Sequence, residues 1–132
     1  MRNVFVGCVA LAASAWVQAA DVSDFFGVMG CSVDNRRFIG VQLTDTISDA
    51  AGRTTSKPGR VALEWNGGKA IKVNWGRPEV QGDGAVKLSF DGRAPVVLKL
   101  LRPVPVEDND YKPFFTLKEE GGKAYRCGFE AE

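Results

Sequence analysis

The sequence contains no histidine, and this absence excludes the commonest catalytic devices. A serine or cysteine nucleophile is usually activated by an imidazole base, and imidazole is a standard ligand of catalytic zinc. Serine–lysine chemistry would need a pair such as Ser56 and Lys57, but neighbours in sequence rarely share one catalytic geometry. We therefore expect no catalytic residue, no metal ion and no cofactor, and a protein that is not an enzyme.

Long hydrophobic runs are also rare, and the one extended run covers residues 4–17. It is shorter than the roughly 20 residues that a membrane-spanning helix needs. Arg2 precedes the run and the small residue Ala19 follows it, a pattern typical of a secretory signal peptide. We predict a signal peptide over residues 1–19, a single β domain over residues 20–132, and a periplasmic or secreted protein that does not span a membrane.

An excess of charge of either sign is missing as well. The chain has 17 basic and 16 acidic residues, and Arg2 is the one charged residue of the predicted signal peptide, so the mature chain is left with 16 of each. A neutral chain lacks the basic surface that attracts nucleic acids or anionic membranes. We therefore expect no nucleic-acid partner.

Cysteine is sparse, and Cys8 falls within the predicted signal peptide, which leaves Cys31 and Cys127. In an oxidising compartment an isolated pair is most simply a disulfide. A metal site would need more than two thiolates, and a redox pair usually has the Cys-x-x-Cys spacing, which is missing here. We predict a Cys31–Cys127 disulfide that stabilises the fold by roughly 4–5 kcal/mol through closure of a long loop.

What the sequence does contain is alternation of apolar and polar residues with a period of two, the pattern of strands with one buried face. The number of such runs predicts an all-β fold of about seven to eight antiparallel strands, either a small barrel or a two-sheet sandwich, because a single sheet would leave its apolar face wet. The disulfide would join the two strands that must meet to close a barrel. The apolar positions are Ile39, Val41 and Leu43; Val61, Leu63 and Trp65; Ile71, Val73 and Trp75; Val86, Leu88 and Phe90; Val96, Leu98 and Leu100; Phe115 and Leu117; and Tyr125, Cys127 and Phe129.

Two glycine-rich turns predict how successive strands pair. Each fits a three-residue loop whose last residue is a glycine with positive φ. The turn at residues 66–68 would place Leu63 opposite Ile71. The turn at residues 120–122, which ends on Gly122, would place Leu117 opposite Tyr125.

The turn at Asp91-Gly92 gives two conflicting predictions. The dipeptide favours a two-residue turn that pairs Phe90 with Arg93. Matching of the apolar faces instead pairs Leu88 with Val96. A slip of one residue turns a whole strand inside out, so we expect the apolar faces to decide.

Two connections are longer than hairpins need, and both are candidate binding segments. The first covers residues 44–59, and a short helix fits only at residues 45–51. The second covers residues 102–112, where alternating prolines favour an extended chain. For each, a flexible connection is an equally good interpretation.

Carboxylates gather in the second connection, at Glu107, Asp108 and Asp110. Paired carboxylates are the other catalytic device that needs no histidine, as in glycoside hydrolysis, and calcium also binds carboxylate oxygens. The cluster lacks the glycine and the distal glutamate of the EF-hand pattern. We favour a solvated loop over an ion site.

Basic residues fall on the expected outer faces of several strands, at Lys72, Lys87, Lys99 and Arg126, with Glu64 as the main countercharge. On adjacent strands they would form a basic stripe that suits a partner with an acidic surface and speeds encounter. The simpler interpretation, which we favour, is that surface lysines keep a sheet soluble and discourage strand addition.

Aromatic residues divide between the expected core and the expected surface. Trp75 falls on the apolar face of its strand, so we predict that it lies in the core. Phe114 directly precedes Phe115, so one of the two must point outward in a strand, and Tyr111 is close by. An outer apolar patch is a candidate docking surface, unless a loop or the Phe25-Phe26 segment covers it.

Together these patterns favour an exported protein-binding module, such as an inhibitor or immunity protein that neutralises a toxin or an envelope hydrolase. The candidate partner-binding residues are Lys57, Lys99, Tyr111 and Phe114. One alternative is a structural or adhesive component of the cell envelope. The other is a small ligand carrier or a histidine-free hydrolase, which a hollow barrel would favour.

Overall fold

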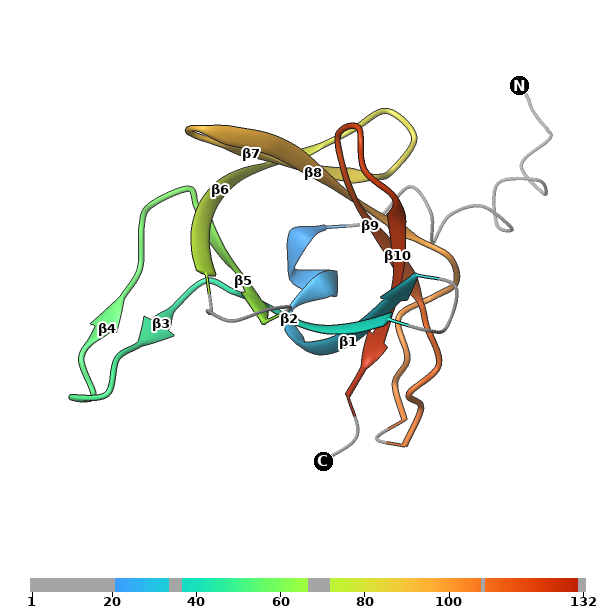
Figure 1. Cartoon of the computed structure of the whole chain (residues 1–132), viewed down its shortest axis with the longest axis horizontal. Helices are drawn as coiled ribbons and strands as arrows, with labels where there is room; N and C mark the ends of the chain where they lie inside the picture. Colours follow the sequence, from blue (N-terminus) through green and yellow to red (C-terminus); the bar gives the residue numbers. More distant parts are fainter. Residues whose placement is uncertain (1–20, 34–36, 67–71, 108, 131–132) are drawn as a thin grey trace, which may run out of the picture.

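The computed structural model describes residues 21–33, 37–66, 72–107 and 109–130 (Figure 1). The predicted signal peptide, residues 1–19, lies outside these ranges. Within them, no helix has the length and apolar character needed to cross a membrane.

Eight antiparallel strands close into a barrel, in the order β1-β10-β9-β8-β7-β6-β5-β2 (Figure 1). The predicted all-β fold is confirmed, and of the two predicted architectures the chain adopts the barrel. The strands are β1 (Gly27–Val33), β2 (Arg37–Thr44), β5 (Val61–Asn66), β6 (Lys72–Val80), β7 (Val86–Phe90), β8 (Arg93–Leu100), β9 (Phe115–Glu119) and β10 (Ala124–Phe129). Two short strands, β3 (Ile47–Ser48) and β4 (Thr54–Thr55), form a separate hairpin.

Period-two alternation places one apolar row of most barrel strands in the interior, where the rows meet as the core. Most of the predicted apolar positions are therefore buried. Ten side chains from six of the strands are among those at most 2 % exposed: Met29, Val41, Leu43, Leu63, Val86, Leu88, Val96, Leu98, Phe115 and Leu117.

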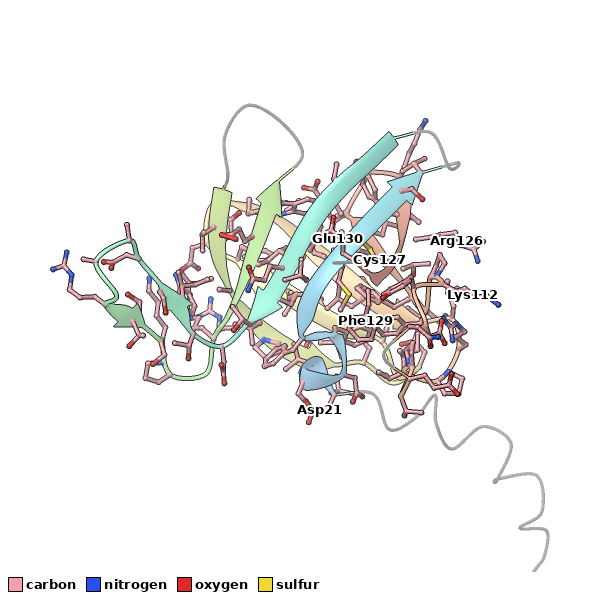
Figure 2. The ribbon with its side chains drawn as sticks, turned by 90° about the horizontal axis from the view of Figure 1, so that it is seen from below. Asp21, Lys112, Arg126, Cys127, Phe129 and Glu130 are labelled. Atoms are coloured by element: carbon pink, nitrogen blue, oxygen red, sulfur yellow. A yellow bond between two sulfur atoms is a disulfide. The ribbon has the colours of Figure 1, made fainter. Side chains whose placement is uncertain are left out.

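The predicted disulfide joins the first and last strands of the barrel. Cys31 on β1 lies directly opposite Cys127 on β10, with the two Cα atoms 4.1 Å apart and both side chains buried. The bond therefore joins the first and last strands of the barrel at the edge where the sheet closes, near the labelled Cys127 in Figure 2.

One end of the barrel is plugged by the short 3-10 helix η1 (Val22–Phe25), which is seen within the ring of strands in Figure 1 and at one end in Figure 2. Phe25 is fully buried and its ring meets that of Phe115 edge to face, with the centroids 5.0 Å apart. Phe26 is partly buried against the same core. The N-terminal aromatic pair therefore closes the barrel from inside rather than covering its outer face.

At the Asp91-Gly92 turn, both of the conflicting pairings are present. Leu88 faces Val96 and Phe90 faces Arg93, because the register shifts between Leu88 and Phe90. Gly92 supplies the positive φ, at 81°. A bulge absorbs the extra residue, so the turn keeps its preferred chemistry and the apolar face keeps its direction.

The second predicted glycine turn connects β9 to β10, and its register is confirmed, with Leu117 opposite Tyr125. The positive φ, however, belongs to Gly121, at 80°, and not to Gly122. Gly122 instead donates its backbone N–H to the carbonyl of Glu119, which closes a four-residue turn.

The register predicted between β5 and β6 is wrong. Leu63 faces Asn74, which turns the apolar face of β6 to the opposite side, and Ile71 lies outside the described residues. Val73 is consequently 39 % exposed, and Trp75 is only partly buried instead of lying in the core. The partner of Leu63 is residue 74 in place of residue 71, a shift of three positions, and an odd shift exchanges the two faces of the strand.

The helix expected at residues 45–51 is replaced by the β3–β4 hairpin, which projects from the barrel (Figure 1). Asp49 directs its turn, because its carboxylate accepts the backbone N–H groups of Ala51 and Arg53, both at 2.9 Å. This local bonding is an Asp-specific alternative to a helix.

Candidate functional site

The four predicted partner-binding residues do not form one site. Lys57 follows the β3–β4 hairpin, Lys99 lies on β8, and Tyr111 and Phe114 lie in the long connection between β8 and β9. Each therefore has to be judged by its own surroundings.

Phe114 is not a surface residue, which corrects the prediction that it contacts a partner. Its side chain is fully buried, with ring centroids 4.9 Å from both Phe115 and Phe129. Its backbone N–H donates to the carbonyl of Cys127 and its own carbonyl accepts the N–H of Leu101. A curved chain entering a barrel strand can bury two consecutive aromatic residues, so the rule that one of them must point outward does not hold here.

Lys57 is exposed and lies over an aromatic ring. Its Nζ is 5.5 Å from the centroid of the Trp75 ring, a cation–π arrangement on the outer side of the barrel. The pair exists because β6 is inverted relative to the prediction, which turns Trp75 outward.

The alternative of a basic stripe finds little support. Lys72 pairs with Trp65 in the register of β5 and β6, and Lys99 on β8 is exposed and pairs with Asp83 at 3.8 Å. Lys99 and Arg126 both lie opposite Thr116, on its two sides. Two cations separated by a threonine, one of them already paired, make a weak basic surface.

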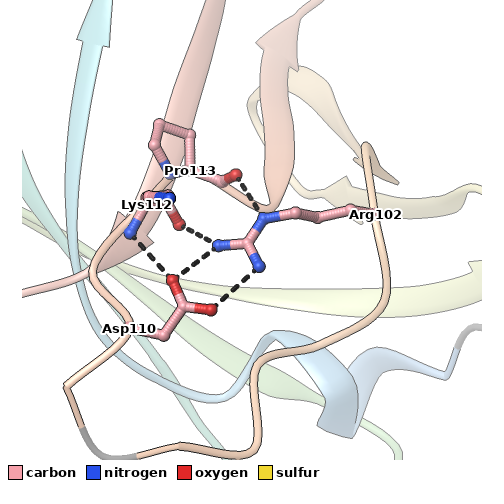
Figure 3. A network of polar contacts seen from close by, with 4 residues as sticks. All are labelled: Arg102, Asp110, Lys112 and Pro113. Atoms are coloured by element: carbon pink, nitrogen blue, oxygen red, sulfur yellow. Dashed lines mark hydrogen bonds and ion pairs between the residues drawn. The ribbon is translucent and has the colours of Figure 1, made fainter.

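The connection between β8 and β9, residues 101–114, is held in shape by one arginine (Figure 3). The guanidinium of Arg102 donates to both carboxylate oxygens of Asp110, at 3.0 and 2.9 Å. It also donates to the backbone carbonyls of Lys112, at 2.8 Å, and Pro113, at 3.0 Å. One side chain thus ties the two ends of the connection together through four hydrogen bonds, which we call the Arg102 clasp. A bidentate fork of this kind fixes geometry as well as charge.

The far end of the connection also lies against the barrel wall. A Cβ added to Gly128 on β10 would come within 2.7 Å of the carbonyl oxygen of Tyr111 and 2.8 Å of that of Lys112. Only glycine leaves room for backbone at this distance. The clasp and this close approach together hold the two ends of the connection against each other and against the barrel.

The connection exposes several apolar side chains to solvent. Val106 is 93 % exposed, Tyr111 47 % and Leu101 43 %. Pro103 and Pro105, between Leu101 and Val106, restrict the backbone further. Apolar side chains are thus exposed at the start, in the middle and near the far end of the connection.

The carboxylates of this loop do not work as a group. Asp110 is bound in the clasp, Glu107 is exposed, and Asp108 lies outside the described residues. In the part of the chain that the structure describes, no three acidic or cysteine side chains come together as metal ligands. The prediction of a solvated carboxylate is therefore wrong for Asp110, because Arg102 binds both of its oxygens.

The clasp predicts how the loop responds to acid. Hydrogen bonds from Arg102 hold the pKa of Asp110 below its ordinary value of about 3.8, and the pKa of Arg102 is raised in turn. A carboxylate with a lowered pKa stabilises the fold above the ordinary value and loses that contribution as the pH falls through the lowered one. We expect the NMR signal of the Arg102 Nε–H to keep its shift until the pH is below 3.8 and then to move to the position of a free arginine.

The Asp110→Asn variant is the control for this titration, because it has no proton to gain and should show the released position at every pH. A wild-type transition at or above the ordinary pKa of aspartate would contradict the clasp.

Sequence reasoning missed a polar cluster inside the barrel, at the end opposite η1. The guanidinium of Arg93 on β8 forms an ion pair with Glu119 on β9 and donates to Oδ1 of Asn74 on β6 at 2.9 Å. It also lies 5.5 Å from the ring centroid of Trp65 on β5 and 5.1 Å from that of Phe90. Since β5 and β8 are not neighbours in the sheet, these contacts cross the interior. We call this cluster the barrel mouth.

The cluster was missed because the sequence predicted the wrong register between β5 and β6. The sequence pattern placed Val73 and Trp75 on the inner face of their strand, which puts Asn74 outside, and gave Glu119 no role. The Asp91-Gly92 dipeptide, with its pairing of Phe90 and Arg93, was the one local hint that Arg93 starts a strand.

Comparison with known proteins adds no further information, because no family model, curated protein or solved structure matches this chain.

Proposed function

We propose that this chain is an exported protein-binding module, an inhibitor or immunity protein that neutralises a toxin or an envelope hydrolase. The observation that carries the proposal is the connection 101–114, where the Arg102 clasp holds exposed apolar side chains in one conformation. The disulfide is compatible with an oxidising compartment outside the cytoplasm.

Rigidity is what makes this loop suited to inhibition. A flexible loop loses conformational freedom when it binds, and that loss reduces affinity, whereas a loop that is already ordered avoids it. Loops of this kind on a rigid β scaffold commonly carry binding function. Tyr111 is the natural anchor, because a tyrosine offers a large contact area with few rotatable bonds.

The alternative, a self-assembling component of the envelope, receives less support from the same fold. The eight described barrel strands all have two neighbours, so this sheet offers no free edge for strand addition. The histidine-free hydrolase alternative depends on the carboxylates of the connection, and the Asp110 carboxylate is occupied by Arg102.

The proposal predicts that Tyr111→Ala weakens binding to the captured partner by at least about 30-fold, the effect of losing a hot-spot anchor of roughly 2 kcal/mol. The partner is first captured from periplasmic and extracellular fractions and then purified, and binding is measured by calorimetry. A toxin or hydrolase should also lose its activity in the complex. Urea melts should differ from those of the wild type by less than about 0.5 kcal/mol, because Tyr111 is a surface residue.

Tyr111→Phe is the matched control, since it keeps the ring and should keep most of the affinity. Unchanged binding of Tyr111→Ala would remove this loop from the interface. Failure to capture any partner, together with a hydrolytic activity that depends on Glu107 or Asp110, would end the binding proposal.

A further inference from the structure

The barrel is closed differently at its two ends. Helix η1 and the aromatic cluster of Phe25, Phe114, Phe115 and Phe129 fill one end with apolar side chains. The mouth at the other end is polar and reaches solvent, since the side chain of Glu119 is 42 % exposed and that of Arg93 22 %. A filled barrel needs no charged groups in its interior. An inward arginine, glutamate and asparagine at one end therefore indicate a purpose other than packing.

The mouth contains a defined space of about 460 Å³ lined by Trp65, Asn74, Arg93 and Glu119. This volume lies within the range of roughly 300–1,000 Å³ that is usual for small-molecule sites. The four lining residues come from four different strands, so the barrel itself holds them in place. The space is thus a scaffold-built pocket with convergent polar groups.

The charge of the pocket is already balanced. Arg93 and Glu119 neutralise one another, so an anion would meet Glu119 and a cation would meet Arg93. A ligand that carries net charge would have to break this ion pair or be repelled by one of its members. The pocket therefore selects for a neutral ligand.

Hydrogen-bonding capacity remains on both the donor and the acceptor side. Oε2 of Glu119 is the oxygen that Arg93 binds, and Oδ1 of Asn74 is the acceptor used there, which leaves Glu119 Oε1 and the Asn74 amide NH2 for a ligand. The indole N–H of Trp65 is buried and has no hydrogen-bond partner within the described structure. Buried donors normally have a partner, and because this N–H is closed to solvent we do not count it among the groups that face the space.

We propose that the barrel mouth binds a small neutral saccharide. Neighbouring sugar hydroxyls each donate and accept, so one edge of a sugar can donate to Glu119 while it accepts from Asn74. The apolar C–H groups of a sugar suit the part of the Trp65 side chain that lines the space beside Arg93. This site lies at the end of the barrel opposite the connection 101–114 and is independent of the proposed partner site.

The test uses the fluorescence of Trp65. Trp75→Phe leaves Trp65 as the one tryptophan of residues 20–132, and Trp75 lies outside the barrel mouth. This variant is titrated with cellobiose and diacetylchitobiose, both neutral, with glucosamine disaccharide as the cationic probe and cellobiouronic acid as the anionic one. We expect saturable changes in emission with at least one neutral disaccharide and at least tenfold weaker binding of the two charged probes.

In the same background, Asn74→Ala should weaken binding of the neutral disaccharide at least tenfold, whereas Asn109→Ala, the same change on an exposed loop, should leave it unchanged. The Glu119→Gln variant keeps the shape of the side chain but upsets the charge balance, so it should allow cellobiouronic acid to bind. The inference is overturned if neither neutral disaccharide saturates, if a charged probe binds best to the unaltered mouth, or if Asn74→Ala binds as tightly as Asn109→Ala. Tyr111→Ala should bind the disaccharide normally, so failure of the partner site and failure of this site can be told apart.

Discussion

Removing the disulfide by the double substitution Cys31→Ala and Cys127→Ala should lower the free energy of unfolding by roughly 4–5 kcal/mol, the value for closure of a loop of this size. The two cysteines are 96 residues apart in sequence, so the bond encloses almost the whole barrel. Both are buried, at the pair of strands that completes the barrel. In the unfolded chain the loss of this constraint increases entropy, which is why the effect exceeds that of any one surface contact.

The measurement is a urea melt of the oxidised wild type, the reduced wild type and the double variant. Reduced wild type and the variant should melt together at lower urea, and reducing agent should leave the variant unchanged. Titration of free thiols in the denatured, unreduced mature protein should find none. Two reactive thiols, or equal stability with and without reductant, would show that the seam is held without the bond.

The outline of the barrel follows from local patterns, because period-two burial and turn chemistry are properties of short segments. They predict the pairing of Leu117 with Tyr125, and at Asp91-Gly92 each of the two conflicting patterns proves right. The bulge between Leu88 and Phe90 reconciles them, and no single pattern contains it.

Strand β6 shows a case in which local sequence patterns predict the wrong face. Its outward residues Val73 and Trp75 are more apolar than its inward residues Asn74 and Gly76, so the hydrophobic pattern indicates the wrong face. The inward row depends on packing against the neighbouring strand β7, where a Cβ at Gly76 would approach the Phe90 ring to 2.8 Å. Such contacts join distant segments and are invisible in a window of a few residues. The barrel mouth was missed for the same reason.

The sequence predicted which segment carries the candidate site, but it did not predict the contacts that hold that segment in shape. Length and prolines marked the segment 102–112 as a binding candidate, and Tyr111 is indeed exposed there. The clasp could not be foreseen, because nothing in the sequence links Arg102 to Asp110 rather than to solvent. The pairing depends on how the loop folds back, and that depends on Phe114, which is anchored in the core.

Phe114→Ala should lower the free energy of unfolding by about 3–5 kcal/mol, the usual cost of truncating a fully buried aromatic side chain. Its ring packs between Phe115 and Phe129 at the plugged end of the barrel and is fully buried. Truncation to alanine would leave a cavity among these side chains. Because its backbone bonds to Leu101 and Cys127, the start of the connection and the disulfide strand are affected as well.

The comparison with Tyr111→Ala makes this result decisive. The two aromatic residues are three positions apart in the same connection, but one is buried and the other is 47 % exposed. Urea melts should show a large loss of stability for Phe114→Ala and almost none for Tyr111→Ala, whereas binding to the partner should fall in both. For Phe114→Ala the loss of binding should follow the loss of folding, and conditions that restore the fold, such as saturating osmolyte, should restore part of the affinity. A Phe114→Ala protein that melts like the wild type but no longer binds would instead place Phe114 in the interface and show that the plugged end of the barrel opens to the partner.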